Sequence, residues 1–143
     1  MKSDDIGRSV HKLSRQLKRG LDIKVAKYGV TGVQCDMIRY IYKKSKEKNV
    51  FARDIEKKFD IRRASMAGIL QNMEKNELIK REDIDSDGRL KRIVLTQKAL
   101  KLRKIIEKEI AKLEDKAMQN IEEEEIRKFI EIAEKMSKNL EDK

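Results

Sequence analysis

Apolar residues recur every three to four positions between Ile6 and Lys27, the spacing of one face of an amphipathic helix. A Tyr-Gly-Val sequence at 28–30 interrupts this pattern. Thr31 and Gln34 then have the spacing of a capping box, in which each side chain bonds an unpaired backbone N–H at a helix start. We therefore predict one helix over residues 6–27. A second helix should begin directly after Thr31 and give way to a lysine-rich loop over residues 43–49.

The middle of the chain combines two short helical patterns with two strand patterns. The helical patterns share residues 52–75 and are separated by an Asp-Ile pair at 60–61, so the two helices must cross steeply. Residues 78–84 and 90–95 alternate branched apolar residues with charged ones, as strands do. Gly88, between them, suits the positive φ of a hairpin tip. We predict a helix-turn-helix followed by a β-hairpin.

The last third of the chain is predicted to be helical. One pattern runs from Thr96 to about Met118, and Asn120 with Glu123 has the spacing of a second helix start. The acidic run 122–125 lies there, where the helix dipole favours negative charge. The predicted fold class is therefore mainly α with a small β-wing, a winged helix-turn-helix with a helical dimerisation region.

The composition indicates a domain that does not cover all its apolar surface alone. Of the 143 residues, 43% are charged and 38% hydrophobic, with no proline, a balance that favours long exposed helices. Aromatic residues are only 4%, and the apolar stripes consist mostly of Ile, Leu, Val and Met. We expect a second subunit to supply the missing core.

The net charge of +10 is unevenly distributed. Residues 1–95 contain 24 Lys and Arg against 14 Asp and Glu, whereas residues 96–143 contain 12 of each. Charge alone favours the plainer interpretation, a lysine-rich solvated surface. The alternative is a basic nucleic-acid face followed by a neutral assembly region.

Several function classes are not expected. No stretch has the roughly 18 apolar residues of a membrane span, and residues 1–30 lack a signal-peptide core, so we expect a cytoplasmic protein. Cys35 is the only cysteine; a buried inert thiol is expected, with a redox sensor as the alternative. His11 lacks neighbours at ligand spacing, so no metal site is predicted. The chain has no phosphate loop or nucleophile elbow, which argues against an enzyme and against a cofactor.

The predicted order of elements is that of a winged helix-turn-helix. In this module the second short helix enters the major groove of double-stranded DNA, and the hairpin, or wing, follows the adjacent backbone. Arg89 would supply a cation at the wing tip, with Lys91 close behind it. The candidate contacts of the recognition helix are its exposed polar residues, namely Arg62, Arg63, Ser65, Gln71 and Asn72.

Nearly the whole chain resembles the MarR family of transcriptional regulators. Val30-Thr31 with Gln34 is similar to that family's Leu-Thr-x-x-Gln, and residues 73–81 (MEKNELIKR) are similar to its Leu-Glu-Lys-x-Gly-Leu-Ile-x-Arg. The wing segment 87–96 (DGRLKRIVLT) matches its Asp-x-Arg followed by a strand that ends in Leu-Thr. The resemblance implies that Arg89 contacts the minor groove or a phosphate and that Asp87 orients it.

Two departures from the family pattern carry expectations of their own. Glu77 stands where the family usually has glycine, so we expect Asn76 to take the left-handed conformation that ends the recognition helix. Gly68 stands where many members carry an arginine, and Ala64 and Ala67 lie beside it. Polar readout by this helix should be limited. Because alanines contact thymine methyls and wing arginines prefer narrow grooves, an A·T-rich operator is expected.

The resemblance also implies an assembly and a regulator. The chain would form a single domain over 1–143, with a DNA-binding module over about 31–96 and a helical dimerisation region over 1–28 and 97–143. It would act as a homodimer, as a repressor on a pseudo-palindromic operator, released by a small aromatic or anionic effector. The candidate effector residues are Arg15, Tyr28, Arg39 and Tyr40, although core packing is the simpler interpretation of the tyrosines. The alternative function is a winged-helix adapter for protein interactions that does not read an operator.

Overall fold

The computed structural model describes residues 3–86 and 88–141. Asp87, a predicted DNA contact, therefore lies outside the described residues. The chain forms two compact units, residues 1–110 and 111–143, which are described here separately.

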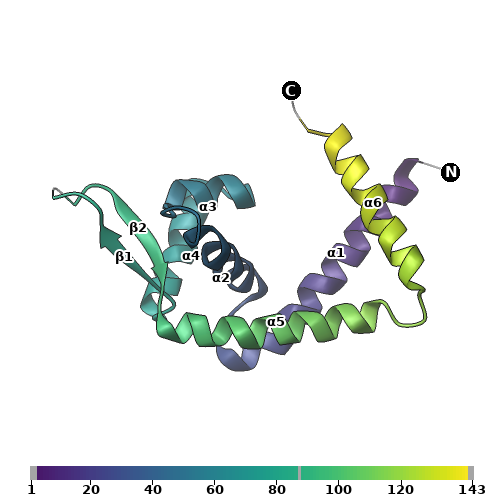
Figure 1. The fold of residues 1–143 in the computed structure, drawn as a ribbon, viewed down its shortest axis with the longest axis horizontal. Helices are drawn as coiled ribbons and strands as arrows, with labels where there is room; N and C mark the ends of the chain where they lie inside the picture. Colours follow the sequence, from purple (N-terminus) through teal and green to yellow (C-terminus); the bar gives the residue numbers. More distant parts are fainter. Residues whose placement is uncertain (1–2, 87, 142–143) are drawn as a thin grey trace. The chain divides into compact units, whose positions relative to one another are not determined.

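Helices dominate both units, and the described residues contain one β-hairpin (Figure 1). The elements are α1 (Ser3–Val25), the short 3-10 helix η1 (Ala26–Tyr28), α2 (Gly32–Ser45), α3 (Ala52–Phe59), α4 (Arg63–Lys75), β1 (Ile79–Asp83), β2 (Lys91–Leu95), α5 (Gln97–Ala117) and α6 (Glu123–Asn139). This is the predicted mainly α fold with a small β-wing, and the prediction is confirmed. The helix ends differ slightly from expectation, because α2 continues to Ser45 into the lysine-rich segment.

The start of α2 is held by the capping box that the sequence predicts. Thr31 Oγ1 accepts a hydrogen bond from the Gln34 N–H at 3.2 Å, and Gln34 Oε1 accepts one from the Thr31 N–H at 3.1 Å. The Asp22 carboxylate of α1 also accepts a hydrogen bond from the Gly32 N–H. A Cβ at Gly32 would lie 2.8 Å from Asp22 Oδ1, so a larger residue there would displace this carboxylate.

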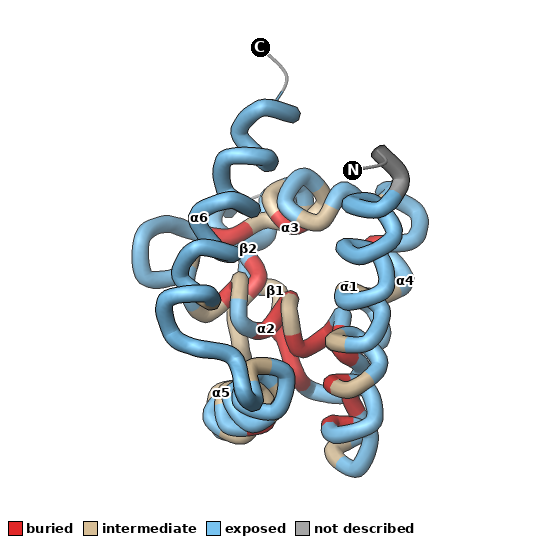
Figure 2. Tube along the Cα trace, turned by 90° about the vertical axis from the view of Figure 1, so that its right-hand side faces the viewer, coloured by how far each residue is buried: buried red, intermediate tan, exposed pale blue. Residues whose placement is uncertain are grey.

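The core of the first unit lies between α2, α3, α4, the base of the hairpin and the first half of α5. Figure 2 shows buried residues concentrated along α2 and at the strands. Their apolar stripes match the predicted periodicities, and burial of such side chains is the main driving force for folding. The largest fully buried residues are Met37, Ile38, Ile41, Ile55, Met66, Leu70, Met73, Leu78, Ile79, Ile93 and Ile106.

The end of α4 corrects one expectation. Asn76 has φ −83° and ψ 9°, whereas Glu77 takes the left-handed conformation, with φ 60°. The Leu78 N–H donates to the Met73 carbonyl at 2.8 Å, and the Glu77 N–H donates to the Glu74 carbonyl at 3.0 Å. These two bonds define a Schellman motif, which requires the left-handed residue at the position of Glu77. The hydrogen bonds of the motif, and not the ease with which asparagine adopts the left-handed conformation, therefore determine which residue adopts it.

The start of α6 corrects a second expectation. Asn120 does not cap this helix, because it lies in the preceding turn with φ 62°, and Glu122 is the N-cap residue. The expected acidic first turn is present, at residues 123–125. In the part of the second unit that is described, 111–141, no residue is buried (Figure 2), and several large apolar residues of α6 are exposed.

Glycine at position 77 should stabilise the protein. Glu77→Gly relieves a left-handed conformation that disfavours side chains, and we expect the free energy of unfolding to rise by about 0.5–1 kcal/mol. Asn76→Gly is the matched control, because Asn76 has negative φ and the substitution should be neutral or destabilising. Chemical unfolding measures both variants; a gain in stability at position 76 instead of position 77 would contradict this assignment.

Candidate nucleic-acid interface

The polar residues predicted on α4 lie on its exposed face. Arg62 is the N-cap residue and Arg63 the first helical residue, and both are exposed. Ser65, Gln71 and Asn72 are exposed as well, while Met66, Leu70 and Met73 hold the opposite face in the core. The amphipathic pattern thus directs these polar groups outward. Whether they contact DNA remains a prediction.

The middle of this exposed face is a low surface, because it carries only small residues. Ala64, Ala67 and Gly68 are all exposed, and a Cβ built at Gly68 would meet nothing within 4 Å. Packing therefore does not require glycine there, although glycine in a helix interior costs about 1 kcal/mol relative to alanine. The exposed polar side chains of α4 therefore flank a central stretch of small residues.

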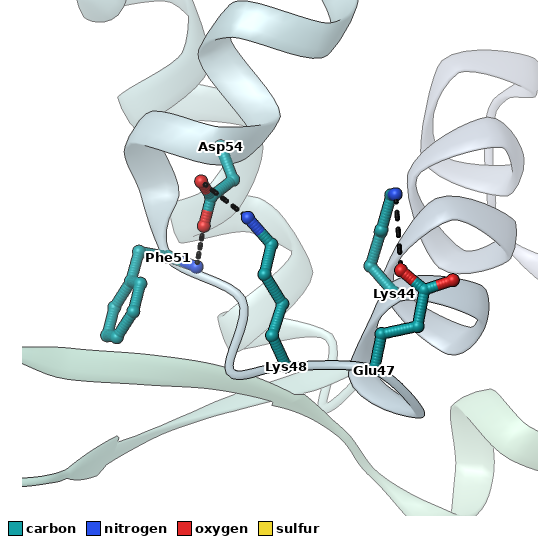
Figure 3. A network of polar contacts seen from close by, with 5 residues as sticks. All are labelled: Lys44, Glu47, Lys48, Phe51 and Asp54. Carbon is teal, nitrogen blue, oxygen red and sulfur yellow. Dashed lines mark hydrogen bonds and ion pairs between the residues drawn. The ribbon is translucent and has the colours of Figure 1, made fainter.

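The connection between α2 and α3 is braced by polar contacts (Figure 3). The Phe51 N–H donates to Asp54 Oδ2 at 2.9 Å, which satisfies an unpaired donor at the start of α3. Lys48 Nζ lies 3.6 Å from Asp54 Oδ1, and Lys44 Nζ lies 3.4 Å from Glu47 Oε2. The contacts to Asp54 fix the point where the chain enters α3.

The wing is an antiparallel pair in which charged residues face each other. The register places Glu82 opposite Arg92 and Asp83 opposite Lys91. Lys91, a predicted DNA contact, lies 3.5 Å from Asp83 Oδ1, but both side chains are about half exposed, so this ion pair contributes little to stability. Gly88 has φ 68°, as the hairpin prediction requires, and Arg89 beside it is exposed.

The wing is attached to the helices at several points. The Ile93 N–H donates to the Val50 carbonyl at 2.7 Å, which joins β2 to the α2–α3 connection. Arg92 hydrogen-bonds to Asn49 in the same connection. Arg81 of β1 lies 3.6 Å from Glu74 of α4. Sequence patterns did not indicate these links, because each joins residues in different elements.

The four candidate effector residues have different surroundings. The Tyr40 ring packs edge-to-face on Phe59 of α3, with centroids 5.8 Å apart, whereas Arg39 Nε donates to Glu107 of α5 at 2.8 Å. Tyr28 lies in η1 with the Lys27 ammonium over its ring, and Arg15 is exposed on α1. Two cavities of about 630 and 280 Å³ are lined by other residues.

The chemistry around Cys35 favours an inert thiol. Cys35 is fully buried, and burial, followed by the nearby Asp36 and Asp22 carboxylates, raises the pKa of its thiol to about 12. At neutral pH the thiol is therefore protonated, and it is the thiolate that reacts.

Among the described residues, no group of three or more His, Cys, Asp or Glu side chains could hold a metal ion. None of the described helices is long and apolar enough to cross a membrane.

Comparisons with known proteins agree with this architecture. A family model described as MarR family matches residues 28–90. The chain is similar to the solved structure of the transcription regulator MarR from Oenococcus oeni, with 32% identity, a TM-score of 0.72, and coverage of 93% of this chain and 98% of that one.

Two further structures share the fold at lower identity. A MarR transcriptional regulator from Methanosarcina mazei has 19% identity and a TM-score of 0.84, with coverage of 97% of this chain and 91% of that one. The MepR protein of Staphylococcus aureus, solved as a DNA complex, has 23% identity and a TM-score of 0.79, with coverage of 98% and 97%.

Proposed function

The chain belongs to the MarR family of transcription regulators, and from this we propose that it binds double-stranded DNA as a homodimer through α4 and the wing. The observation that carries the proposal is the exposed polar face of α4 beside a glycine-tipped hairpin with Arg89 at its tip. The DNA complex of the related fold in MepR supports this use of the module. We infer that the chain is not an enzyme, since regulators of this kind act by binding.

The proposed division of labour follows from where the cations lie. Arg62 and Arg63 stand at the start of α4, where a recognition helix meets the sugar-phosphate backbone. Arg89 stands on a narrow hairpin that fits a minor groove, with Asp87 proposed to orient it and Lys91 to add a phosphate contact. Ser65, Gln71 and Asn72 would read bases. Because the face at Ala67 and Gly68 is low, shape readout by the wing should favour an A·T-rich operator.

The homodimer is proposed because two helices expose apolar residues that one protomer leaves uncovered. On α1 these are Ile6, Val10 and Leu13, and on α6 they include Phe129, which is 56% exposed, and Ile130. A second copy would cover them around a two-fold axis. Residues 1–28 and 97–143 would then form the dimerisation region of a single functional domain, and residues 31–96 would be the DNA-binding module.

Regulation is the finer part of the proposal. We propose that the protein represses transcription and that a small aromatic or anionic effector relieves this repression. The effector would bind at a site lined by Arg15, Tyr28, Arg39 and Tyr40. Such a ligand must bind the DNA-competent and released forms with different affinity, or it shifts nothing. The low surface of α4 favours one second candidate, an adapter for protein interactions. An affinity for duplex DNA no better than for any polyanion at physiological salt would support the adapter.

The proposed dimer predicts the mass in solution. Sedimentation velocity at micromolar concentration should give twice the 16.8 kDa chain mass. Phe129→Asp places a charge in the proposed interface and should shift the protein towards monomer or unfolded chain. Val33→Asp is the control, because this exposed residue of α2 lies outside the proposed dimerisation region. A folded monomer of the unmodified protein would refute the obligate dimer.

The proposed DNA contacts predict two kinds of effect. Arg62→Ala or Arg63→Ala should weaken operator and scrambled duplex alike, and reduce the salt slope by about one for each phosphate that is no longer neutralised. Arg89→Ala should cost about 1–3 kcal/mol and fall hardest on A·T-rich flanks, where the narrow groove concentrates negative potential. Asp87→Ala should reproduce part of the Arg89→Ala effect without removing positive charge.

Titration of each variant against both duplexes at two salt concentrations measures these effects. Lys116→Ala is the control, because it removes one exposed cation of α5 outside the DNA-binding module. If Arg89→Ala binds the operator as tightly as the unmodified protein, the wing assignment is wrong.

A further inference from the structure

We propose that Arg92 is a positioning residue that clamps the wing to the α2–α3 connection and so sets the angle between the wing and α4. The proposal deepens the DNA binding proposed above and rests on it. It assigns a role to a wing arginine that faces a carboxylate and an amide of the protein itself.

The guanidinium of Arg92 uses all three of its nitrogens. Its Nε and Nη2 lie 3.0 and 2.9 Å from Glu82 Oε1, across the hairpin on the opposite strand. Its Nη1 donates to Asn49 Oδ1 at 3.3 Å, in the connection between α2 and α3. The rigid fork of a guanidinium makes such a bridge directional, in contrast to the single charged point of a lysine.

This bridge adds a second bond between β2 and the α2–α3 connection, beside the link from Arg81 of β1 to Glu74 of α4. A two-stranded hairpin is only marginally stable alone, so contacts with the helices must set its direction. The Ile93 N–H bonds the Val50 carbonyl at 2.7 Å, and a single bond of this kind leaves rotation about itself. Arg92 and Asn49 are the neighbours of these two residues, and their side-chain bond opposes that rotation.

The α2–α3 connection is itself anchored, so the clamp transmits direction to the helices. Asp54, in the first turn of α3, accepts a hydrogen bond from the Phe51 N–H and pairs with Lys48 (Figure 3). Asn49 lies between these two anchored residues in the sequence. The orientation of the wing is therefore fixed relative to α3, the helix that precedes α4 in the helix-turn-helix.

A direct phosphate contact by Arg92 is the rival explanation, and the sign of one charge change separates the two. Glu82→Gln removes the carboxylate charge that holds Arg92, which weakens this contact, and raises the net charge of the wing by one. Electrostatics alone predicts tighter DNA binding from that change, whereas disruption of the clamp predicts weaker binding to a specific site. Asp83→Asn is the matched control. It changes the net charge by the same amount at the next residue pair towards the hairpin tip, where Asp83 faces Lys91.

The experiment measures fluorescence anisotropy with two duplexes of about 30 base pairs, long enough for two half-sites one helical turn apart. One is selected from a random pool by the unmodified protein, and the other is its shuffled sequence. We expect Glu82→Gln and Asn49→Ala to bind the selected duplex about three- to tenfold more weakly, the effect of an exposed polar link worth roughly 1 kcal/mol. Asp83→Asn should bind both duplexes as tightly as the unmodified protein or tighter.

Hydrogen exchange at the Ile93 amide gives a readout that does not depend on DNA. Glu82→Gln and Asn49→Ala should speed exchange there, and Asp83→Asn should not. If Glu82→Gln tightens binding to both duplexes and leaves this exchange unchanged, the clamp is overturned. If exchange speeds up as expected but the unmodified protein selects no sequence, the clamp stands and the proposed operator binding fails.

Discussion

The fold depends on one residue at which three elements meet. Thr96 Oγ1 donates to the Glu77 carbonyl at 2.6 Å and accepts from the Ala99 N–H at 3.2 Å, while its own N–H donates to the Leu78 carbonyl at 3.1 Å. The hydroxyl thus joins the end of α4 to the first turn of α5, directly after β2. Because one side chain serves these elements, α4, the wing and α5 cannot change direction independently.

This junction holds α4 and the wing in a fixed relation, so that both could contact the same DNA duplex in the binding proposed here. The end of α4 is closed by the Schellman motif at Glu77, and Lys98 Nζ adds a bond to the Asn76 carbonyl at 2.8 Å. The wing leaves the same point and is held again by Arg92 and Arg81. In the DNA binding proposed here, α4 has few polar side chains at its centre and would depend on the wing for specificity, so the relative direction of α4 and the wing would matter more than any single contact.

The features predicted from the sequence are those that local chemistry determines. The capping box at Thr31 and Gln34, the glycine tip at Gly88 and the helical stripes all depend on residues close together in the chain, and each is present. The prediction for Asn76 was wrong because the hydrogen bonds that close α4 place the left-handed conformation at Glu77. The prediction for Asn120 was wrong because this residue takes the left-handed conformation in the turn before α6, where Glu122 is the N-cap residue.

The features that the sequence did not predict depend on the tertiary fold. Arg92 and Asn49 are 43 residues apart, and nothing in either local pattern indicates the other. The same holds for Tyr40, which packs on Phe59 of α3, and for Arg39, which pairs with Glu107 of α5. The predicted DNA contacts and effector residues remain predictions, because exposure on the right face shows that a side chain is available and not what it binds.

Native-state hydrogen exchange of Thr96→Val against Thr96→Ser tests the junction most directly. Valine keeps the shape of threonine and removes the hydroxyl, whereas serine keeps the hydroxyl. If Thr96 couples its elements, valine should speed exchange about tenfold both at the Ala99 amide and at the Leu78 amide, which closes α4, and serine should leave both near their original rates. Faster exchange at Ala99 alone would show that Thr96 is only a cap of α5 and would contradict the account.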